Sequence, residues 1–127
     1  MHELSIALAV VETISERLLA GNRLPDEARE PSARPRVESV TLAVGVLSGV
    51  DPAALRFAFP EATAGTALAG AALEIEEVGL VAFCPSCDRE QAIPSVRRLR
   101  CPVCRTPTPR VVKGRELEIL RVAIVEG

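Results

Sequence analysis

Residues 84–104 read CPSCDREQAIPSVRRLRCPVC and hold all four cysteines of the chain. The cysteines form two Cys-x-x-Cys pairs, and 13 residues separate the pairs. One such turn brings two thiolates close enough to bind a single ion, and two turns supply the four sulfurs that tetrahedral Zn²⁺ prefers. A redox-active dithiol and an iron–sulfur cluster are the alternative interpretations, and two paired turns at this spacing favour zinc. We therefore predict a structural Zn(II) site whose ligands are Cys84, Cys87, Cys101 and Cys104.

The segments on either side of the cysteines have the alternating pattern of β-strands. Residues 72–78 (ALEIEEV) alternate Leu and Ile with Glu, and residues 116–127 (ELEILRVAIVEG) place apolar side chains at every second position. Further upstream, residues 37–50 (VESVTLAVGVLSGV) alternate over a β-branched stretch. We expect these three strands to form one small sheet, with the cysteine module inserted between the second and third strands.

Two helices are predicted beside this sheet. Apolar residues recur every three or four positions over residues 4–21, which is the pattern of an amphipathic helix. Asp51 can cap a second, short helix that has Pro52 in its first turn, and Pro60 should distort or end its last turn. The proline-rich residues 21–36 are typical of a connection. The predicted fold class is therefore α+β, a three-stranded sheet covered by one long and one short helix.

The charge is unevenly distributed along the chain. Residues 81–115 carry eight basic and two acidic side chains, formally +6, whereas the whole chain is −2, so the remainder is −8. This polarity predicts two domains: residues 1–79 with 114–127 form the α+β domain, and residues 80–113 form the zinc module. A basic zinc module also suggests nucleic-acid binding, but Phe83 is its only aromatic residue for base stacking, which argues against it.

The composition indicates the compartment. The 127 residues contain no apolar run of ~18 residues that could span a bilayer, and the first residues lack the basic and apolar regions of a signal peptide. We expect a cytoplasmic protein with no membrane partner. In a reducing compartment, cysteines are more often metal ligands than structural disulfides, which agrees with the zinc prediction.

The chain begins MHEL, and His2 is its only histidine. A polar residue near a terminus is often simply solvated. However, the Met1 amine, the His2 amide nitrogen and the His2 imidazole can form chelate rings around one metal ion, and such nitrogen-rich coordination suits Ni²⁺ or Cu²⁺. Glu3 can add an oxygen ligand or a hydrogen bond to a ligand. We therefore predict a second, open metal site at the start of the α+β domain, with His2 as ligand and Met1 and Glu3 as further candidates.

Several motifs together resemble the HypA/HybF family of hydrogenase-maturation nickel metallochaperones. They are the opening MHELSIA, residues 47–78 (LSGVDPAALRFAFPEATAGTALAGAALEIEEV), the paired CPSC and CPVC, and residues 114–126 (GRELEILRVAIVE). The resemblance implies Ni(II) delivery through His2, with Glu3 beside it, and structural zinc at the four cysteines. It also implies a GTPase partner, the large subunit of [NiFe]-hydrogenase as recipient and, in some members, a role in urease maturation with urease accessory proteins.

Two functions from different classes follow. The favoured one is a metal-delivery protein that is not an enzyme, because Ser48, Asp51 and Glu61 offer no nucleophile–base set when His2 is the only histidine. The alternative is a zinc-ribbon adaptor that binds nucleic acid or protein through its basic module, with His2 incidental.

Overall fold

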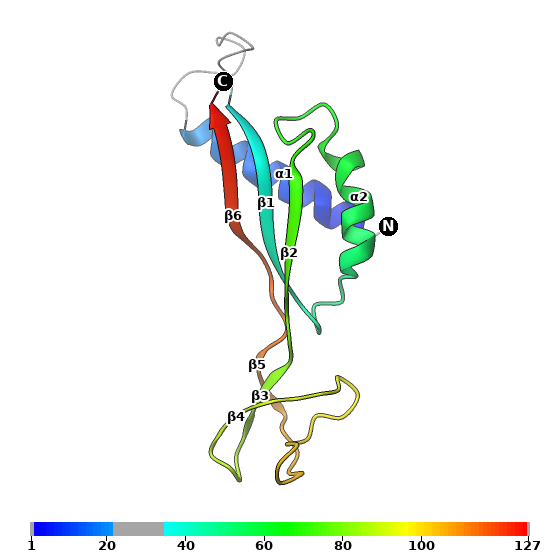
Figure 1. Cartoon of the computed structure of the whole chain (residues 1–127), viewed down its shortest axis with the longest axis vertical. Coiled ribbons are helices and arrows are strands. Elements are labelled where there is room, and N and C mark those ends of the chain that lie inside the picture. The colour runs from blue at the N-terminus through cyan, green and yellow to red at the C-terminus, as the bar shows by residue number, and fades with distance from the viewer. Residues whose placement is uncertain (1, 22–34, 127) are drawn as a thin grey trace. The chain divides into compact units, whose positions relative to one another are not determined.

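The computed structural model describes residues 2–21 and 35–126. These residues form two helices and six strands (Figure 1). The elements are, in chain order, α1 (His2–Gly21), β1 (Pro35–Gly45), α2 (Pro52–Thr63), β2 (Ala72–Val78), β3 (Val81–Cys84), β4 (Arg89–Ala92), β5 (Arg110–Lys113) and β6 (Leu117–Glu126). The predicted α+β fold is confirmed. No helix in the described part of the chain is long and apolar enough to cross a membrane.

The three strands predicted from the sequence form one sheet in the order β2-β1-β6. The central strand β1 is buried on both faces from Val40 to Gly45, which explains why its sequence is a nearly continuous apolar run there. Its end differs from the prediction, because β1 stops at Gly45 and Val46 is 49% exposed in the turn that follows. The edge strand β2 keeps the predicted alternation, with Leu73 and Ile75 half-buried between exposed neighbours.

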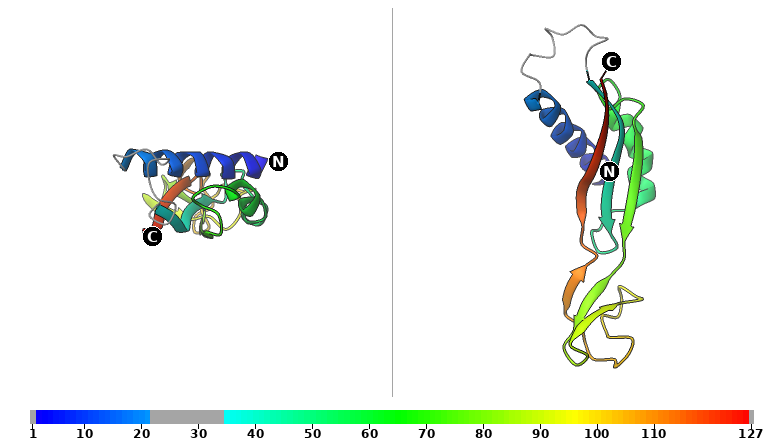
Figure 2. Two further views of the ribbon diagram at one scale, coloured as in Figure 1. Left: turned by 90° about the horizontal axis from the view of Figure 1, so that it is seen from above. Right: turned by 60° about the vertical axis from the view of Figure 1, so that its left-hand side comes forward.

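Helices α1 and α2 pack together and cover one face of this sheet (Figures 1 and 2). Helix α1 starts at His2, two residues before the predicted start, and buries Ala7, Val11 and Ile14 along one stripe. Its bounds overturn our expectation that His2 precedes the helix. The apolar periodicity begins at Leu4, whereas the first turn of a helix needs no apolar side chain.

Asp51 caps α2 as predicted. Its backbone is extended (φ −86°, ψ 114°), and its Oδ1 accepts a hydrogen bond of 3.0 Å from the backbone N–H of Ala53. Pro60 lies inside the helix, which continues to Thr63. The tertiary contacts of this last turn hold it despite the missing Pro60 N–H, since the inward side chains stay buried on both sides of the proline. These are Leu55, Ala58, Phe59, Ala62 and Thr63.

The chain divides into two compact units. The first contains the described residues up to Leu42, Asp51–Glu74 and the described residues from Ile119 onward; the second contains Ala43–Val50 and Ile75–Glu118. Each long strand therefore contributes residues to both units, whereas the predicted domain boundaries assign each strand to a single domain. The functional division into residues 1–79 with 114–127 and residues 80–113 stays a prediction.

The second unit contains a sheet that the sequence analysis did not predict. Its strand order is β4-β3-β5, and β3 pairs antiparallel with both neighbours, with Cys84 opposite Arg89 and Phe83 opposite Arg110. Buried Leu80, Ala82 and Ile93 form its small core. Leu47, Leu99 and Val111 pack against this core. The sheet places the first cysteine pair at the end of β3.

Two backbone segments of the second unit approach closely at Gly45. The Gly45 N–H donates to the carbonyl of Glu116 (2.7 Å), and the Leu47 N–H donates to the carbonyl of Gly114 (2.6 Å). A Cβ atom on Gly45 would overlap the carbonyl group of Gly114, which itself has φ +127°. Glycine is therefore required at both positions, at Gly45 for space and at Gly114 for its backbone conformation.

Candidate metal centre

The four cysteines converge on one point of the second unit. Their Sγ atoms all lie within 4.8 Å of one another. The Sγ atoms of Cys84 and Cys104 are 3.4 Å apart, and those of Cys87 and Cys101 are 3.9 Å apart. A disulfide requires about 2.05 Å between sulfurs, so all four are free thiols. Each sulfur of the first Cys-x-x-Cys pair thus lies beside a sulfur of the second pair.

This arrangement of sulfurs fits a metal ion with tetrahedral coordination. Zn–S bonds of about 2.3 Å in a tetrahedron give sulfur–sulfur edges of about 3.8 Å. The two distances given above bracket that edge length, and the buried pair Cys84 and Cys101 with the more accessible Cys87 and Cys104 closes the shell from four sides. The residues therefore fit Zn(II), which would supply the cross-link between the two cysteine turns.

Each Cys-x-x-Cys turn is ended by a residue in the left-handed backbone region. Asp88 follows the first pair with φ 54°, and Arg105 follows the second with φ 63°. The first turn has the Cys87 N–H 3.4 Å from the Sγ of Cys84; in the second, the Arg105 N–H donates to the carbonyl of Cys101 (2.8 Å). In both turns, the residue directly after the second cysteine has a left-handed backbone conformation.

Hydrogen-bond donors surround the sulfurs and favour the thiolate form of two of them. The Oγ1 of Thr106 lies 3.2 Å from the Sγ of Cys104, and hydrogen bonding with the Thr106 side chain and backbone lowers the pKa of Cys104 to about 6. The backbone amides of Cys104 and Val103 lower the pKa of Cys101. A hydrogen bond with Cys104 is the main cause that raises the pKa of Cys87 to about 12. A bound cation would displace that remaining proton.

Sequence reasoning missed Thr106 and the two left-handed residues. Thr106 also lies within hydrogen-bond distance of Ser86, with 2.9 Å between the two hydroxyl oxygens, so it links the two cysteine turns. Its backbone carbonyl accepts a hydrogen bond of 2.9 Å from the N–H of Cys101. The only sequence signal for this role is its position two residues after the last cysteine, which is too common a feature to be predictive.

The predicted nickel residues lie in the first unit. His2 is the first residue of α1, and its side chain is exposed. The carboxylate Oε2 of Glu3 accepts a hydrogen bond of 3.2 Å from the backbone N–H of Asp51, the residue that caps α2. This hydrogen bond is the main cause that lowers the pKa of Glu3. Met1 lies outside the described residues, so the predicted chelate with its amine is not part of the described structure.

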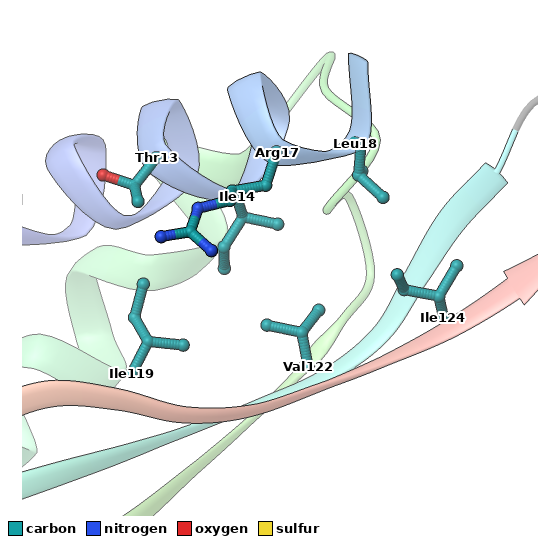
Figure 3. Close-up of a pocket in the computed structure, with 7 residues that line it drawn as sticks. All are labelled: Thr13, Ile14, Arg17, Leu18, Ile119, Val122 and Ile124. Carbon is teal, nitrogen blue, oxygen red and sulfur yellow. The ribbon is translucent and has the colours of Figure 1, made fainter. Parts of the chain in front are cut away.

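The first unit also has a groove of about 290 Å³ between α1 and β6 (Figure 3). One ionisable side chain, that of Arg17, and the hydroxyl of Thr13 stand at its α1 side. The remaining lining is aliphatic and consists of Ile14, Leu18, Ile119, Val122 and Ile124. This lining suits an apolar surface rather than a hydrophilic ligand.

Fold and site define a small α+β protein with a four-cysteine metal centre, and comparisons with known proteins specify it further. The family model described as "Hydrogenase/urease nickel incorporation, metallochaperone, hypA" matches residues 1–124. The chain is 45% identical to the hydrogenase maturation factor HypA of Roseiflexus sp. (strain RS-1) over 119 residues, which cover 94% of this chain and 88% of that one. It is 44% identical to the HypA of Deinococcus radiodurans over 119 residues, 94% of this chain and 89% of that one. The chain belongs to the HypA family.

Solved structures agree with the fold. The solution structure of the Ni metallochaperone HypA from Helicobacter pylori superimposes with a TM-score of 0.56 at 17% identity, over 98% of both chains. A second solution structure of a HypA protein gives a TM-score of 0.59 at 19% identity, over 98% of this chain and 97% of the other. At these identities the similarity establishes the fold alone.

Proposed function

We propose that this protein is a nickel metallochaperone that binds Ni(II) at the start of α1 and delivers it to the large subunit of [NiFe]-hydrogenase during maturation. It works with a GTPase partner and, where urease is present, with urease accessory proteins. The observation that carries the proposal is the family match over residues 1–124, which includes His2, Glu3 and all four cysteines. Delivery requires binding and release of the ion but no covalent reaction, so the protein is not an enzyme.

The start of α1 offers nitrogen ligands. The first N–H groups of a helix have no carbonyl partner within the helix, so the amide nitrogen of His2 is not committed to a helical hydrogen bond. The exposed imidazole adjoins it, and the amine of Met1, where it is free, completes a chelate that suits Ni²⁺. An exposed site of this kind permits transfer, because a recipient can approach the ion directly.

Glu3 has two roles in this proposal. Its Oε2 anchors the beginning of α1 to the backbone of Asp51, and the same carboxylate is the candidate oxygen ligand for the metal. The lowered pKa of Glu3 keeps the carboxylate ionised to a lower pH than an ordinary glutamate. Oxygen ligands of this type would complete the coordination of a divalent cation.

The cysteine centre has a structural role in the proposal. Four thiolates complete the coordination shell of Zn(II), which leaves no open position for a substrate. The ion would hold the end of β3 and the turn at Cys101–Cys104 together in a unit with a core of few buried residues. Cys84, Cys87, Cys101 and Cys104 thus bind the resident Zn(II), and His2 with its neighbours binds the transported Ni(II).

Metal stoichiometry tests the proposal. Zinc-loaded protein is mixed with excess Ni²⁺, desalted and assayed for both metals, then treated with a mild chelator and assayed again. The proposal predicts one zinc that survives the chelator and one nickel that is removed by it. A zinc-ribbon adaptor without a delivery role would retain zinc and bind no stoichiometric nickel.

A further inference from the structure

The second unit carries a basic loop that neither metal site explains. Residues 91–115 contain seven basic side chains and no Asp or Glu. Four arginines are concentrated within nine residues of this stretch, and all four are exposed. We call Arg97, Arg98, Arg100 and Arg105 the arginine loop.

The arginine loop has a defined backbone. The side chain and carbonyl of Ser95 accept hydrogen bonds from the N–H groups of Arg97 (3.2 Å) and Arg98 (3.3 Å). Leu99 packs against the core formed by Leu80, Ala82 and Ile93, while its arginine neighbours are exposed. The Nη1 of Arg100 donates to the carbonyl of Arg105 (3.3 Å), which joins the residues that flank the second cysteine pair. The four arginines therefore lie on one ordered stretch of backbone.

The charges of the arginine loop are not neutralised by the protein itself. Among the described residues, none of the four arginines forms an ion pair with a carboxylate. A zinc ion with four thiolates carries a net charge of −2, which offsets only part of the +6 of residues 81–115. Like charges at close range repel one another, so this concentration of arginines is unfavourable for the isolated protein and favours an anionic ligand.

Exposed apolar residues in the same stretch of chain indicate which anion the arginine loop fits. Val96 is 48% exposed and Val103 is 65% exposed, so aliphatic side chains accompany the arginines. Binding of single-stranded nucleic acid relies on aromatic side chains that stack with bases. Phe83 is half-buried, and the guanidinium of Arg110 lies 5.6 Å from its ring centroid. The surface therefore suits carboxylates combined with aliphatic side chains better than it suits bases.

We propose that the arginine loop, with Val96 and Val103, is a docking surface for an acidic, partly apolar segment of a partner protein. The inference rests on the proposed function, because a protein that delivers nickel must contact its recipient. Arg guanidinium groups bind carboxylates in a bidentate geometry, and a concentrated positive charge accelerates encounter with an acidic partner. The docking surface and the proposed nickel site use different residues in different units, so each can be removed separately.

The test measures binding of a short fluorescein-labelled peptide, in which glutamate alternates with leucine and serine, to the full zinc-loaded chain by fluorescence anisotropy. The loop variant is Arg97→Gln/Arg98→Gln/Arg105→Gln. The matched control is Arg17→Gln/Arg36→Gln/Arg56→Gln, which removes the same charge from exposed arginines of the first unit. We expect the loop variant to lose about tenfold or more in affinity and the control to stay within about twofold. Raising the salt concentration should weaken wild-type binding.

Three results would overturn the proposal: equal losses in both variants, equal binding of a peptide with glutamine in place of glutamate, or tighter binding of an oligothymidylate of equal charge. The loop variant should also keep wild-type zinc content, which shows that its second unit is folded. Nickel titration of the same variants separates this inference from the proposed function. A loop variant that binds nickel normally but does not bind the peptide supports the docking surface. If the wild-type protein binds the peptide but no nickel, the result counts against the proposed delivery role and not against the docking surface.

Discussion

The carboxylate of Glu3 and the backbone amide of Asp51 are joined by a hydrogen bond of 3.2 Å, although 48 positions separate them in the sequence. The bond connects the first turn of α1, where the proposed nickel site lies, to the residue that caps α2. The position of His2 is thereby tied to the packed helices of the first unit. A metal site at a free chain end would lack this support.

The Glu3 hydrogen bond predicts a pH-dependent contribution to stability. The pKa of Glu3 in the folded protein is lowered from 4.5. The contribution of Glu3 to the free energy of unfolding is therefore complete above pH 4.5 and is lost as the pH falls through the pKa of the folded protein. Urea unfolding of the wild type and Glu3→Gln, each at a series of pH values, measures this effect. We expect the wild type to be the more stable protein at neutral pH and the difference to shrink in acid. A difference that is constant from neutral to acidic pH would contradict the assignment.

Gly45 should tolerate no side chain. In Gly45→Ala, the new methyl group overlaps the carbonyl of Gly114, and both belong to backbone that is fixed by hydrogen bonds. We expect a loss of about 2–3 kcal/mol in the free energy of unfolding. Gly79→Ala is the matched control, because nothing lies within 4 Å of its added Cβ, and it should change stability by less than about 0.5 kcal/mol. Equal stability of the two variants would refute the close approach.

The left-handed residue after each cysteine pair gives a third prediction. Asp88 has φ 54°, which glycine adopts freely and β-branched residues adopt only with strain. Asp88→Gly should change the free energy of unfolding of the zinc-loaded protein by less than about 0.5 kcal/mol. Asp88→Val should lower that free energy by about 1–2 kcal/mol. Differential scanning calorimetry provides the measurement. A Val variant as stable as the Gly variant would show that the turn does not require this conformation.

The cysteine centre predicts loss of zinc when one ligand is removed. Cys84→Ser and Cys101→Ser each leave three thiolates, which cannot complete the tetrahedral shell. We expect lower zinc content by elemental analysis and faster proteolysis within residues 81–113, since the second unit has a core of few buried residues. Ser86→Ala serves as the control, because it removes the hydroxyl of the first turn that lies 2.9 Å from the Thr106 hydroxyl but no sulfur ligand. Full zinc content in both cysteine variants would exclude these residues as ligands.

Much of the fold follows from local patterns in the sequence. The apolar periodicity of α1, the alternation in β1, β2 and β6, and the Asp51 cap each predict an element that the structure contains. The second sheet escaped prediction because β3, β4 and β5 are four residues long, too short to display a periodicity. These strands depend on their pairing and on a small core to which β3 contributes Ala82 and β5 contributes Val111.

The residues of the candidate sites also differ in whether they could be predicted from the sequence. The cysteine cluster could be predicted because the ligands of a metal site are set by residue type and spacing. Thr106 and the contact between Glu3 and Asp51 could not be predicted, since they depend on which segments meet in space. The exposed start of α1 at His2 combines both cases: the residue type suggested a ligand, and only the structure gives its position on a helix.

The most direct test of the account is calorimetric nickel titration of zinc-loaded wild type, His2→Ala and a variant with a short extension before Met1. We expect one tight nickel site in the wild type. His2→Ala should lose at least about tenfold in nickel affinity while keeping zinc content and stability, because its exposed side chain contributes to nickel coordination and not to the core. The extension should weaken binding by converting the Met1 amine into an amide. Wild-type nickel affinity in His2→Ala would contradict the proposed site, and wild-type affinity in the extended protein would exclude the amine as a ligand.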